Sequence, residues 1–175
     1  MWWVELTVVP IPATRDDEYQ EVAWAVPALG EPFKPIHINR PNVAEGQVKF
    51  KMLYSGICHG DVHWTKGEFG SKTFPMVPGH ELLGEVTEIG EGVTKFKVGD
   101  KVGVGFFIDS CMDCSQCKAG DENYCDKGMT FTYDGDKSHG RVLGNPESKT
   151  WGGYSGSNVV HERFCSKIPD GVPPT

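Results

Sequence analysis

Four cysteines in the middle of the chain follow the spacing C-x2-C-x2-C-x7-C, and all four fall within fifteen residues. Four thiolates close a tetrahedral zinc site with Zn–S bonds of about 2.3 Å, and short spacings let successive turns present sulfur to one point. Two disulfides or four unlinked thiols are the alternatives. A site with four protein ligands has no open position, so it would stabilise structure. The four residues are Cys111, Cys114, Cys117 and Cys125.

The loop that carries these cysteines has few apolar residues of its own. Because its polar residues cannot pack a core, metal binding would supply the stability that a core provides elsewhere. We therefore predict a zinc-stapled loop. The polar residues are Asp113, Ser115, Gln116, Lys118, Gly120, Asp121, Glu122 and Asn123.

A second group of chemically capable residues lies upstream, around Cys58 and His80. Cys58 follows a strand-like pattern, so a rigid element can hold it while it stays accessible. A thiolate and an imidazole suit zinc, and Glu81 offers a carboxylate either as a ligand or as a hydrogen-bond partner of one. Taken singly, each has an ordinary interpretation: Cys58 as a buried apolar side chain, and His80 and His63 as surface or hydrogen-bonded histidines.

The elements that must hold these residues are mostly strands. Apolar residues alternate with polar or small ones from Val22 to Val26 and from Val48 to Tyr54, which is typical of half-buried strands. Only 59–66 has a helical pattern, and no Gly-x-Gly-x-x-Gly follows a predicted strand, so a dinucleotide-binding unit is not expected in this chain. Further strands are expected at 82–89, 101–107, 129–133 and 154–160.

Composition agrees with one mainly β domain. The 175 residues are 38% hydrophobic, and 22 glycines with 12 prolines favour many tight turns. A net charge of −7 gives no basic field for a phosphate backbone, so neither nucleic acid nor an anionic membrane surface is expected as a partner. The longest apolar run, Val102 to Ile108, is too short to span a bilayer.

The first residues of the chain carry two prolines and the charged cluster RDDE at 15–18. We interpret 1–18 as an N-terminal extension that pairs with nothing later, and 19–175 as the domain. The N-terminus has no basic segment before its apolar residues, so a secretory signal is not expected. We therefore expect a cytoplasmic, reducing location, where cysteines serve as metal ligands or buried thiols.

The segment GHELLG at 79–84, continuing to Gly90 and Val93, resembles the zinc signature of the medium-chain zinc-dependent alcohol dehydrogenases. The four-cysteine loop is similar to their structural zinc lobe. The resemblance runs from about Glu21 to Val172, and the branch that looks most similar is that of the cinnamyl alcohol dehydrogenases. It implies a GroES-like β-barrel with short helices, in agreement with the strand pattern. The branch motifs are GICH at 56–59, FPMVPGHE at 74–81 and GGYS at 152–155.

The resemblance implies that zinc acts as a Lewis acid on an alcohol or carbonyl oxygen while hydride moves to or from NADP or NAD. Cys58 and His80 would be catalytic zinc ligands, with Glu81 close behind the metal as a further candidate ligand. Asp61 would orient His80 through a hydrogen bond. The cinnamyl-like branch suggests NADP.

Two histidines would serve the cofactor and the proton. His59 matches a position near the cofactor pyrophosphate, and His63 matches the far end of the family's proton relay, beside the cofactor. Both also have the interpretation of exposed histidines without a task.

Three departures from the family pattern affect these expectations. Gly60 stands where the family has Ser or Thr, whose hydroxyl passes the alcohol proton onward. The family's third catalytic ligand, a cysteine, would fall after Thr175, and Cys165 does not match it. The nucleotide-binding domain and the C-terminal part of the catalytic domain have no counterpart here. We therefore expect an incomplete catalytic domain, inactive alone.

Three hypotheses follow. The first is the N-terminal catalytic part of an alcohol dehydrogenase that acts on a small-molecule alcohol or aldehyde, as a possible homo-oligomer. The second is a stand-alone zinc-binding module for structure or protein contact, without activity. The third, a four-cysteine nucleic-acid finger, is disfavoured because acidic residues outnumber basic ones in the cysteine loop.

Overall fold

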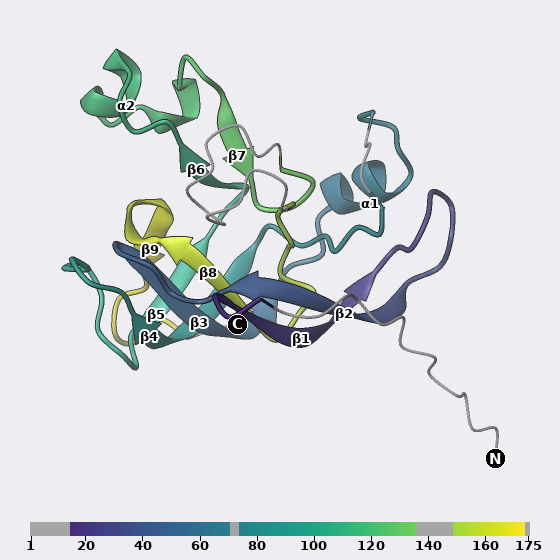
Figure 1. Cartoon of the computed structure of the whole chain (residues 1–175), viewed down its shortest axis with the longest axis horizontal. Coiled ribbons are helices and arrows are strands. Elements are labelled where there is room, and N and C mark those ends of the chain that lie inside the picture. The colour runs from purple at the N-terminus through teal and green to yellow at the C-terminus, as the bar shows by residue number, and fades with distance from the viewer. Residues whose placement is uncertain (1–14, 71–73, 136–148, 174–175) are drawn as a thin grey trace.

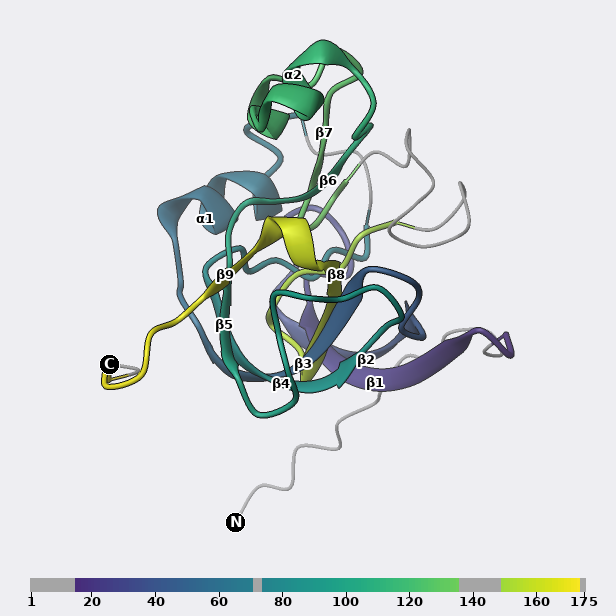
Figure 2. The same ribbon diagram turned by 90° about the vertical axis from the view of Figure 1, so that its left-hand side faces the viewer.

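The computed structural model describes residues 15–70, 74–135 and 149–173. Its centre is a five-stranded antiparallel sheet in the order β8-β3-β4-β5-β9, which curls around an apolar core (Figures 1 and 2). A short loop joins β3 to α1, and a longer connection, residues 90–100, joins β4 to β5. The strands are β3 (Gln47–Ser55), β4 (Leu82–Ile89), β5 (Lys101–Val104), β8 (Ser157–His161) and β9 (Cys165–Lys167).

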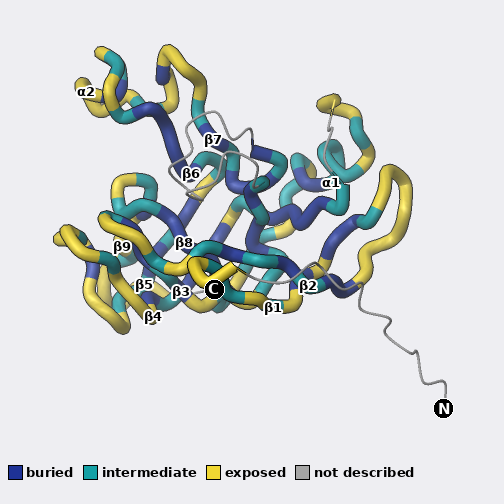
Figure 3. The backbone as a smooth tube through the Cα atoms, viewed as in Figure 1, coloured by how far each residue is buried: buried dark blue, intermediate teal, exposed yellow. Residues whose placement is uncertain are grey.

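The alternation in the sequence places one face of this sheet in the core. Val48 and Phe50 of β3 are buried, as are Val86, Val102 and Val160 on neighbouring strands. Each such side chain contributes about 1.5–3 kcal/mol when it is fully removed from water. Figure 3 shows that the buried stretches follow the sheet, whereas the turns between strands are exposed. The predicted strands at 48–54 and 82–89 are confirmed.

A hairpin of β1 (Glu18–Ala25) and β2 (Lys34–Pro41) forms a second layer with its own small core. β1 confirms the predicted strand at 22–26. β2 was not predicted, because Pro35 and Pro41 at its ends make the segment look unlike a strand.

The hairpin also corrects the expectation that 1–18 pairs with nothing later in the chain. Glu18 pairs with Pro41 at the start of β1, and the carbonyl of Asp17 accepts a hydrogen bond from the Asn42 amide at 2.8 Å. Residues 15–18 therefore belong to the folded domain. The rest of that expectation, for 1–14, lies outside the described residues.

The cysteine loop forms a lobe that projects from the sheet on a two-stranded ribbon (Figure 1). The predicted strand at 101–107 is wrong at its end, because the chain leaves the sheet at Gly105 and changes partner from β4 to β7. The apolar run at 102–108 continues across this point, so the sequence pattern does not indicate the change of partner strand. The lobe and its ribbon contain β6 (Phe107–Ser110), α2 (Ser115–Ala119), η1 (Glu122–Tyr124) and β7 (Met129–Phe131).

Helix α1 (His59–Thr65) confirms the one predicted helix. Its N-cap is Cys58, whose Sγ accepts a hydrogen bond from the Gly60 amide, while the Asp61 carboxylate accepts one from the Cys58 amide. The one-turn elements α2, η1 and η2 (Glu162–Phe164) are too short to give a helical period and were not predicted. Within the described ranges, no helix is long and apolar enough to cross a membrane.

Candidate metal centres

The four cysteines of the lobe come together as a compact sulfur cluster. Their Sγ atoms all lie within 4.8 Å of one another, and all four thiols are free. The Sγ atoms of Cys111 and Cys117 are 3.8 Å apart. This matches the edge of a tetrahedron whose Zn–S bonds are about 2.3 Å long. The donor set and its spacing therefore fit a four-coordinate zinc ion.

The backbone of the lobe is arranged around these sulfurs. The amides of Cys114, Cys117 and Cys111 donate to the Sγ atoms of Cys111, Cys114 and Cys125, at 3.3, 3.5 and 3.4 Å. Hydrogen bonds from the Asp113 and Cys114 amides lower the pKa of the Cys111 thiol to about 6. Burial raises the pKa of Cys117 to about 11. One thiolate is thus favoured by the fold, and a bound cation would favour all four.

A second cluster is formed by Cys58, His80 and Glu81. One ligand atom from each lies within 4.8 Å of the others. Cys58 follows the end of β3, and His80 and Glu81 come just before β4. The two segments meet because the strands pair there: Ser55 lies opposite Leu82, and the Gly56 amide donates to the Glu81 carbonyl at 2.8 Å.

Asp61 joins both sides of this second cluster. Its carboxylate is 3% exposed. Oδ1 accepts from the Gly79 amide and from His80 Nδ1, each at 3.0 Å. Oδ2 accepts from the Cys58 amide at 3.1 Å and from the Tyr154 hydroxyl at 3.0 Å. Since His80 Nδ1 donates its proton to Asp61, the Nε2 lone pair is free to bind a metal.

Comparison with known proteins identifies the family. The alcohol dehydrogenase GroES-like domain matches residues 44–170. The chain belongs to this family. Both the resemblance to zinc-dependent alcohol dehydrogenases and the GroES-like fold expected from it are confirmed.

Individual relatives of this alcohol dehydrogenase domain are longer proteins. NADP-dependent alcohol dehydrogenase C 1 of Mycolicibacterium smegmatis is 46% identical over 152 residues, which cover 86% of this chain and 42% of the relative. Probable cinnamyl alcohol dehydrogenase 5 of Oryza sativa subsp. japonica is 48% identical over 139 residues, 79% of this chain and 37% of the relative. The chain thus spans less than half the length of these relatives.

Comparison with solved structures points to the same family as these sequence relatives. A cinnamyl alcohol dehydrogenase from Sorghum bicolor superposes with a TM-score of 0.81 at 39% identity, over 89% of this chain and 42% of the other. The enzyme from Helicobacter pylori, solved in complex with NADP(H), gives a TM-score of 0.81 at 38% identity, over 89% and 43% of the two chains.

The remaining predicted residues of the dehydrogenase site lie on or near α1. The His59 and His63 rings meet edge to face at 4.7 Å, and His63 Nδ1 contacts the Glu68 carboxylate. Hydrogen bonding with His63 lowers the pKa of Glu68. Gly60 faces the second cluster, because a Cβ atom there would lie 3.3 Å from His80 Cε1 and 3.5 Å from the Cys58 Sγ.

Cys165 lies apart from both clusters. It is 2% exposed on β9, and burial raises its pKa to about 12. Its Sγ donates to the His161 carbonyl at 3.6 Å. Cys165 is therefore a packed strand thiol.

Sequence reasoning missed a group of aromatic rings beside His80. The His80 and Phe106 rings lie 5.3 Å apart, Phe106 and Phe131 4.5 Å, and Phe131 and Trp64 5.9 Å. Tyr133 is buried next to them, with its hydroxyl 3.5 Å from His80 Nδ1. These rings come from three separate segments. The alternation of Phe131 and Tyr133 was the only local signal.

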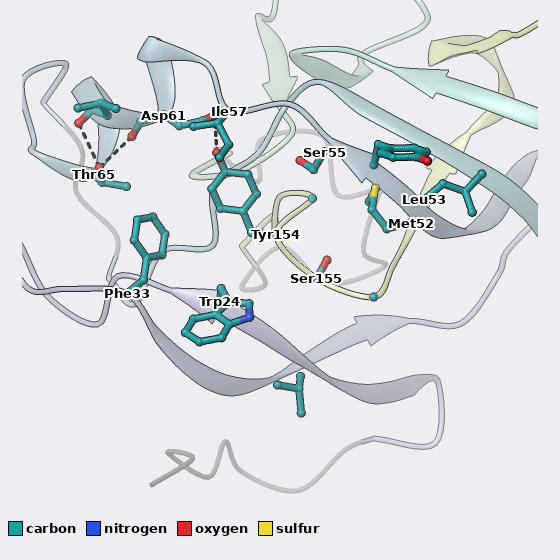
Figure 4. Close-up of a pocket in the computed structure, with 15 residues that line it drawn as sticks. Trp24, Phe33, Met52, Leu53, Ser55, Ile57, Asp61, Thr65, Tyr154 and Ser155 are labelled. Atoms are coloured by element: carbon teal, nitrogen blue, oxygen red, sulfur yellow. Dashed lines mark hydrogen bonds between the residues drawn. The ribbon is translucent and has the colours of Figure 1, made fainter. Parts of the chain in front are cut away.

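A cavity of about 700 Å³ lies on another side of Asp61. Asp61 and Tyr154 form part of its wall, as Figure 4 shows, whereas the three candidate ligands of the second cluster do not line it. Most of the remaining wall is apolar. It includes Val22, Trp24, Phe33, Met52, Tyr54 and Ile57.

Proposed function

We propose that this chain is the N-terminal catalytic part of a zinc-dependent alcohol dehydrogenase, which interconverts an alcohol and an aldehyde by hydride transfer with NADP(H). The observation that carries the proposal is the meeting of Cys58, His80 and Glu81 within 4.8 Å. NADP is favoured over NAD because the M. smegmatis relative is named NADP-dependent and the H. pylori structure contains NADP(H).

Cys58 and His80 would hold the catalytic metal, with Glu81 as the further candidate ligand. Glu81 would take the place of the cysteine that the family resemblance implies as third ligand, and three protein ligands leave one position open. Bound zinc would supply Lewis acidity toward the substrate oxygen. Asp61 keeps the Nδ1 proton of His80 in place and so fixes which nitrogen faces the cluster. The sulfur cluster of the lobe would hold a second, structural zinc.

The aromatic rings beside His80 favour a flat, apolar substrate. Phe106, Phe131 and Trp64 form an apolar cluster of rings next to His80, which would suit contact with an aromatic ring. Two of the similar proteins are named cinnamyl alcohol dehydrogenases. We therefore propose aromatic alcohols and aldehydes as the substrate class.

The roles of the histidines on α1 are part of the proposal. His59 would lie near the cofactor pyrophosphate, and His63 would end a proton relay beside the cofactor. We propose 15–175 as the catalytic domain, in place of the 19–175 expected from the sequence, and 1–14 as an extension. Without a nucleotide-binding domain, the chain alone would be inactive.

The location and partners of the protein are also part of the proposal. Six free cysteines favour a reducing, cytoplasmic location. The net charge of −7 disfavours nucleic acid and membrane surfaces as partners. A homo-oligomer is compatible with the apolar side chains that line the large cavity.

A chimera tests the function. Residues 1–175 would be joined to the remainder of the M. smegmatis relative and assayed for NADPH-dependent reduction of cinnamaldehyde. We expect turnover that is lost in Cys58→Ser and kept in Cys165→Ala, a matched change outside both clusters. A folded, zinc-loaded chimera without turnover would contradict the proposal and favour the stand-alone zinc-binding module.

A further inference from the structure

The hydroxyl of Tyr154 reaches the buried carboxylate that holds the second cluster together. It donates to Asp61 Oδ2 at 3.0 Å, across a separation of 93 residues in the sequence (Figure 4). Burial raises the pKa of Tyr154, and the negative charge of Asp61 adds to that shift. The hydroxyl therefore stays protonated and acts as a donor.

Among the described residues, the hydrogen bonds to Oδ2 of Asp61 come from two donors, one of which belongs to the metal-binding segments. That one is the Cys58 amide, at 3.1 Å. If the Tyr154 hydroxyl were removed, the Cys58 amide would be the remaining donor to Oδ2 among those described above. The orientation of the carboxylate group would then be less firmly fixed. A buried charged acceptor that loses a donor is costly, which favours movement of Asp61 away from its present position. That movement would disturb His80, which is bound to Oδ1.

The backbone around Tyr154 is fixed against the segment that precedes His80. The Gly152 amide donates to the Val77 carbonyl at 2.8 Å, Gly153 to Gly79 at 2.9 Å and Tyr154 to Pro78 at 3.0 Å. The contact is so close that a Cβ atom at Gly152 would overlap the Pro78 carbonyl oxygen. The backbone hydrogen bonds between 152–154 and 77–79 form a rigid frame, which directs the Tyr154 phenol toward Asp61.

Arg40 anchors that frame from the hairpin side. Its guanidinium is 3% exposed and pairs with Glu21. It donates to the Trp151 carbonyl at 3.0 Å, to the Gly152 carbonyl at 2.8 Å and to the Ser155 hydroxyl at 2.7 Å. The segment 151–155 is therefore held between β2 and the loop that carries His80.

We propose that Tyr154 is a positioning residue of the second metal centre, which acts through Asp61 to hold Cys58 and His80 at metal-binding distance. The inference rests on the proposed function, because it takes Cys58, His80 and Glu81 as metal ligands. Tyr133 is a further neighbour of Asp61, and its hydroxyl lies 3.5 Å from His80 Nδ1.

Cobalt titration of the purified, metal-free chain tests this proposal. The four-thiolate and one-thiolate centres differ in their sulfur-to-cobalt absorption, so each is titrated separately with chelator competition in the same sample. Partners one step from a metal ligand typically contribute 10- to 100-fold to metal affinity, and Tyr154 acts one step further, so we expect Tyr154→Phe to weaken the second centre about 3- to 10-fold. The d–d bands of that centre should shift as well.

Two controls separate positioning from general stability. The lobe is an internal control, since Tyr154→Phe should leave the affinity of the four-cysteine centre unchanged. Tyr54→Phe is the matched variant, because Tyr54 is 48% exposed and lines the same cavity. It should leave both centres unchanged.

A pair of shape-matched replacements keeps the test valid if Tyr154→Phe loosens the fold. At position 154, 4-aminophenylalanine keeps a donor and should retain the affinity and spectrum of the second centre, whereas 4-methylphenylalanine has no donor and should not. Equal affinity and spectra for both replacements would overturn the role of Tyr154. A wild-type chain that binds cobalt only at the four-cysteine centre would instead overturn the metal-site assignment on which the inference rests.

Discussion

The two candidate metal centres are built in opposite ways. All ligands of the lobe centre come from 111–125, and the same stretch provides the amides that donate to its sulfurs. The second centre takes Cys58 from the loop after β3 and His80 and Glu81 from the segment just before β4, and the buried Asp61 carboxylate contacts both Cys58 and His80. The ligands of the lobe centre are close together in sequence, whereas those of the second centre are brought together by the pairing of β3 with β4.

This difference implies a difference in how each centre depends on metal. The lobe has no apolar cluster besides its cysteines, so its fold should depend on the ion. The second centre lies between strands that pack on the main core, so it should keep its shape without one. Removing metal with a chelator should therefore affect the two centres unequally.

The largest effect is expected from Cys114→Ser. Structural zinc sites supply about 10–16 kcal/mol of apparent binding energy in small zinc-dependent peptides, and loss of one ligand removes much of that energy. Zinc content should fall, and amides of 109–127 should exchange rapidly in hydrogen-exchange mass spectrometry. Ser115→Ala, an exposed change in the same lobe, is the control. Unchanged exchange would mean that the lobe folds without metal and that the two centres do not differ in this respect.

The second-largest effect is expected from Asp61→Asn. An amide cannot accept from all the donors that surround this carboxylate, and one of its atoms would face them as a donor. Cobalt affinity of the second centre should fall roughly 10- to 100-fold while that of the lobe is unchanged. Asp170→Asn, an exposed change, serves for comparison. Equal loss at both centres would show that they are coupled.

Gly60→Ser should raise activity, whereas the two preceding variants lose metal, and the size of its effect should be smaller. The new side chain would point at His80 and Cys58. The family resemblance implies a hydroxyl at this position that passes on the alcohol proton. In the chimera, alcohol oxidation near pH 7 should rise about tenfold, below the usual range for a positioned acid–base group because water substitutes in part. Gly105→Ser, with open space around it, is the control. The same rate and solvent isotope effect as the parent would indicate that water already does this task.

Arg163→Gln should give the smallest effect, confined to the lobe. Arg163 pairs with Glu122 and donates to the Cys117 carbonyl at 2.6 Å, so it joins the lobe to the segment before β9. Because Arg163 is partly exposed, we expect a loss of about 1 kcal/mol, equal to roughly 2–4 °C in Tm. Zinc content should not change. Lys127→Gln is the exposed control, and an equal shift in it would remove the special role of Arg163.

The sequence predicted the local features of the fold well. Alternation located β1, β3 and β4, and cysteine spacing located the lobe, since both signals lie within a few residues. β2 was missed because of its prolines, and β5 was merged with β6 because an apolar run does not show a change of partner strand.

The second centre was only partly predictable. Cys58 and His80 were singled out by residue type, but the contact between Asp61 and His80 came from the family resemblance. Tyr154 and Arg40 gave no chemical signal, because their contacts join segments 93 and about 110 residues apart. Such long-range contacts depend on tertiary packing, which local patterns do not contain.

The crossing of 77–79 with 152–154 has a consequence for mutational scanning. Gly79 has a φ of 102°, and added side chains at Gly79 or Gly153 would collide with Tyr154 and Leu82, respectively. In a library that replaces every residue in turn, substitutions at these glycines should therefore be tolerated as poorly as substitutions at the metal ligands. A map of sensitivity alone would mark them as chemically active, although they act only by being small enough to let two segments touch.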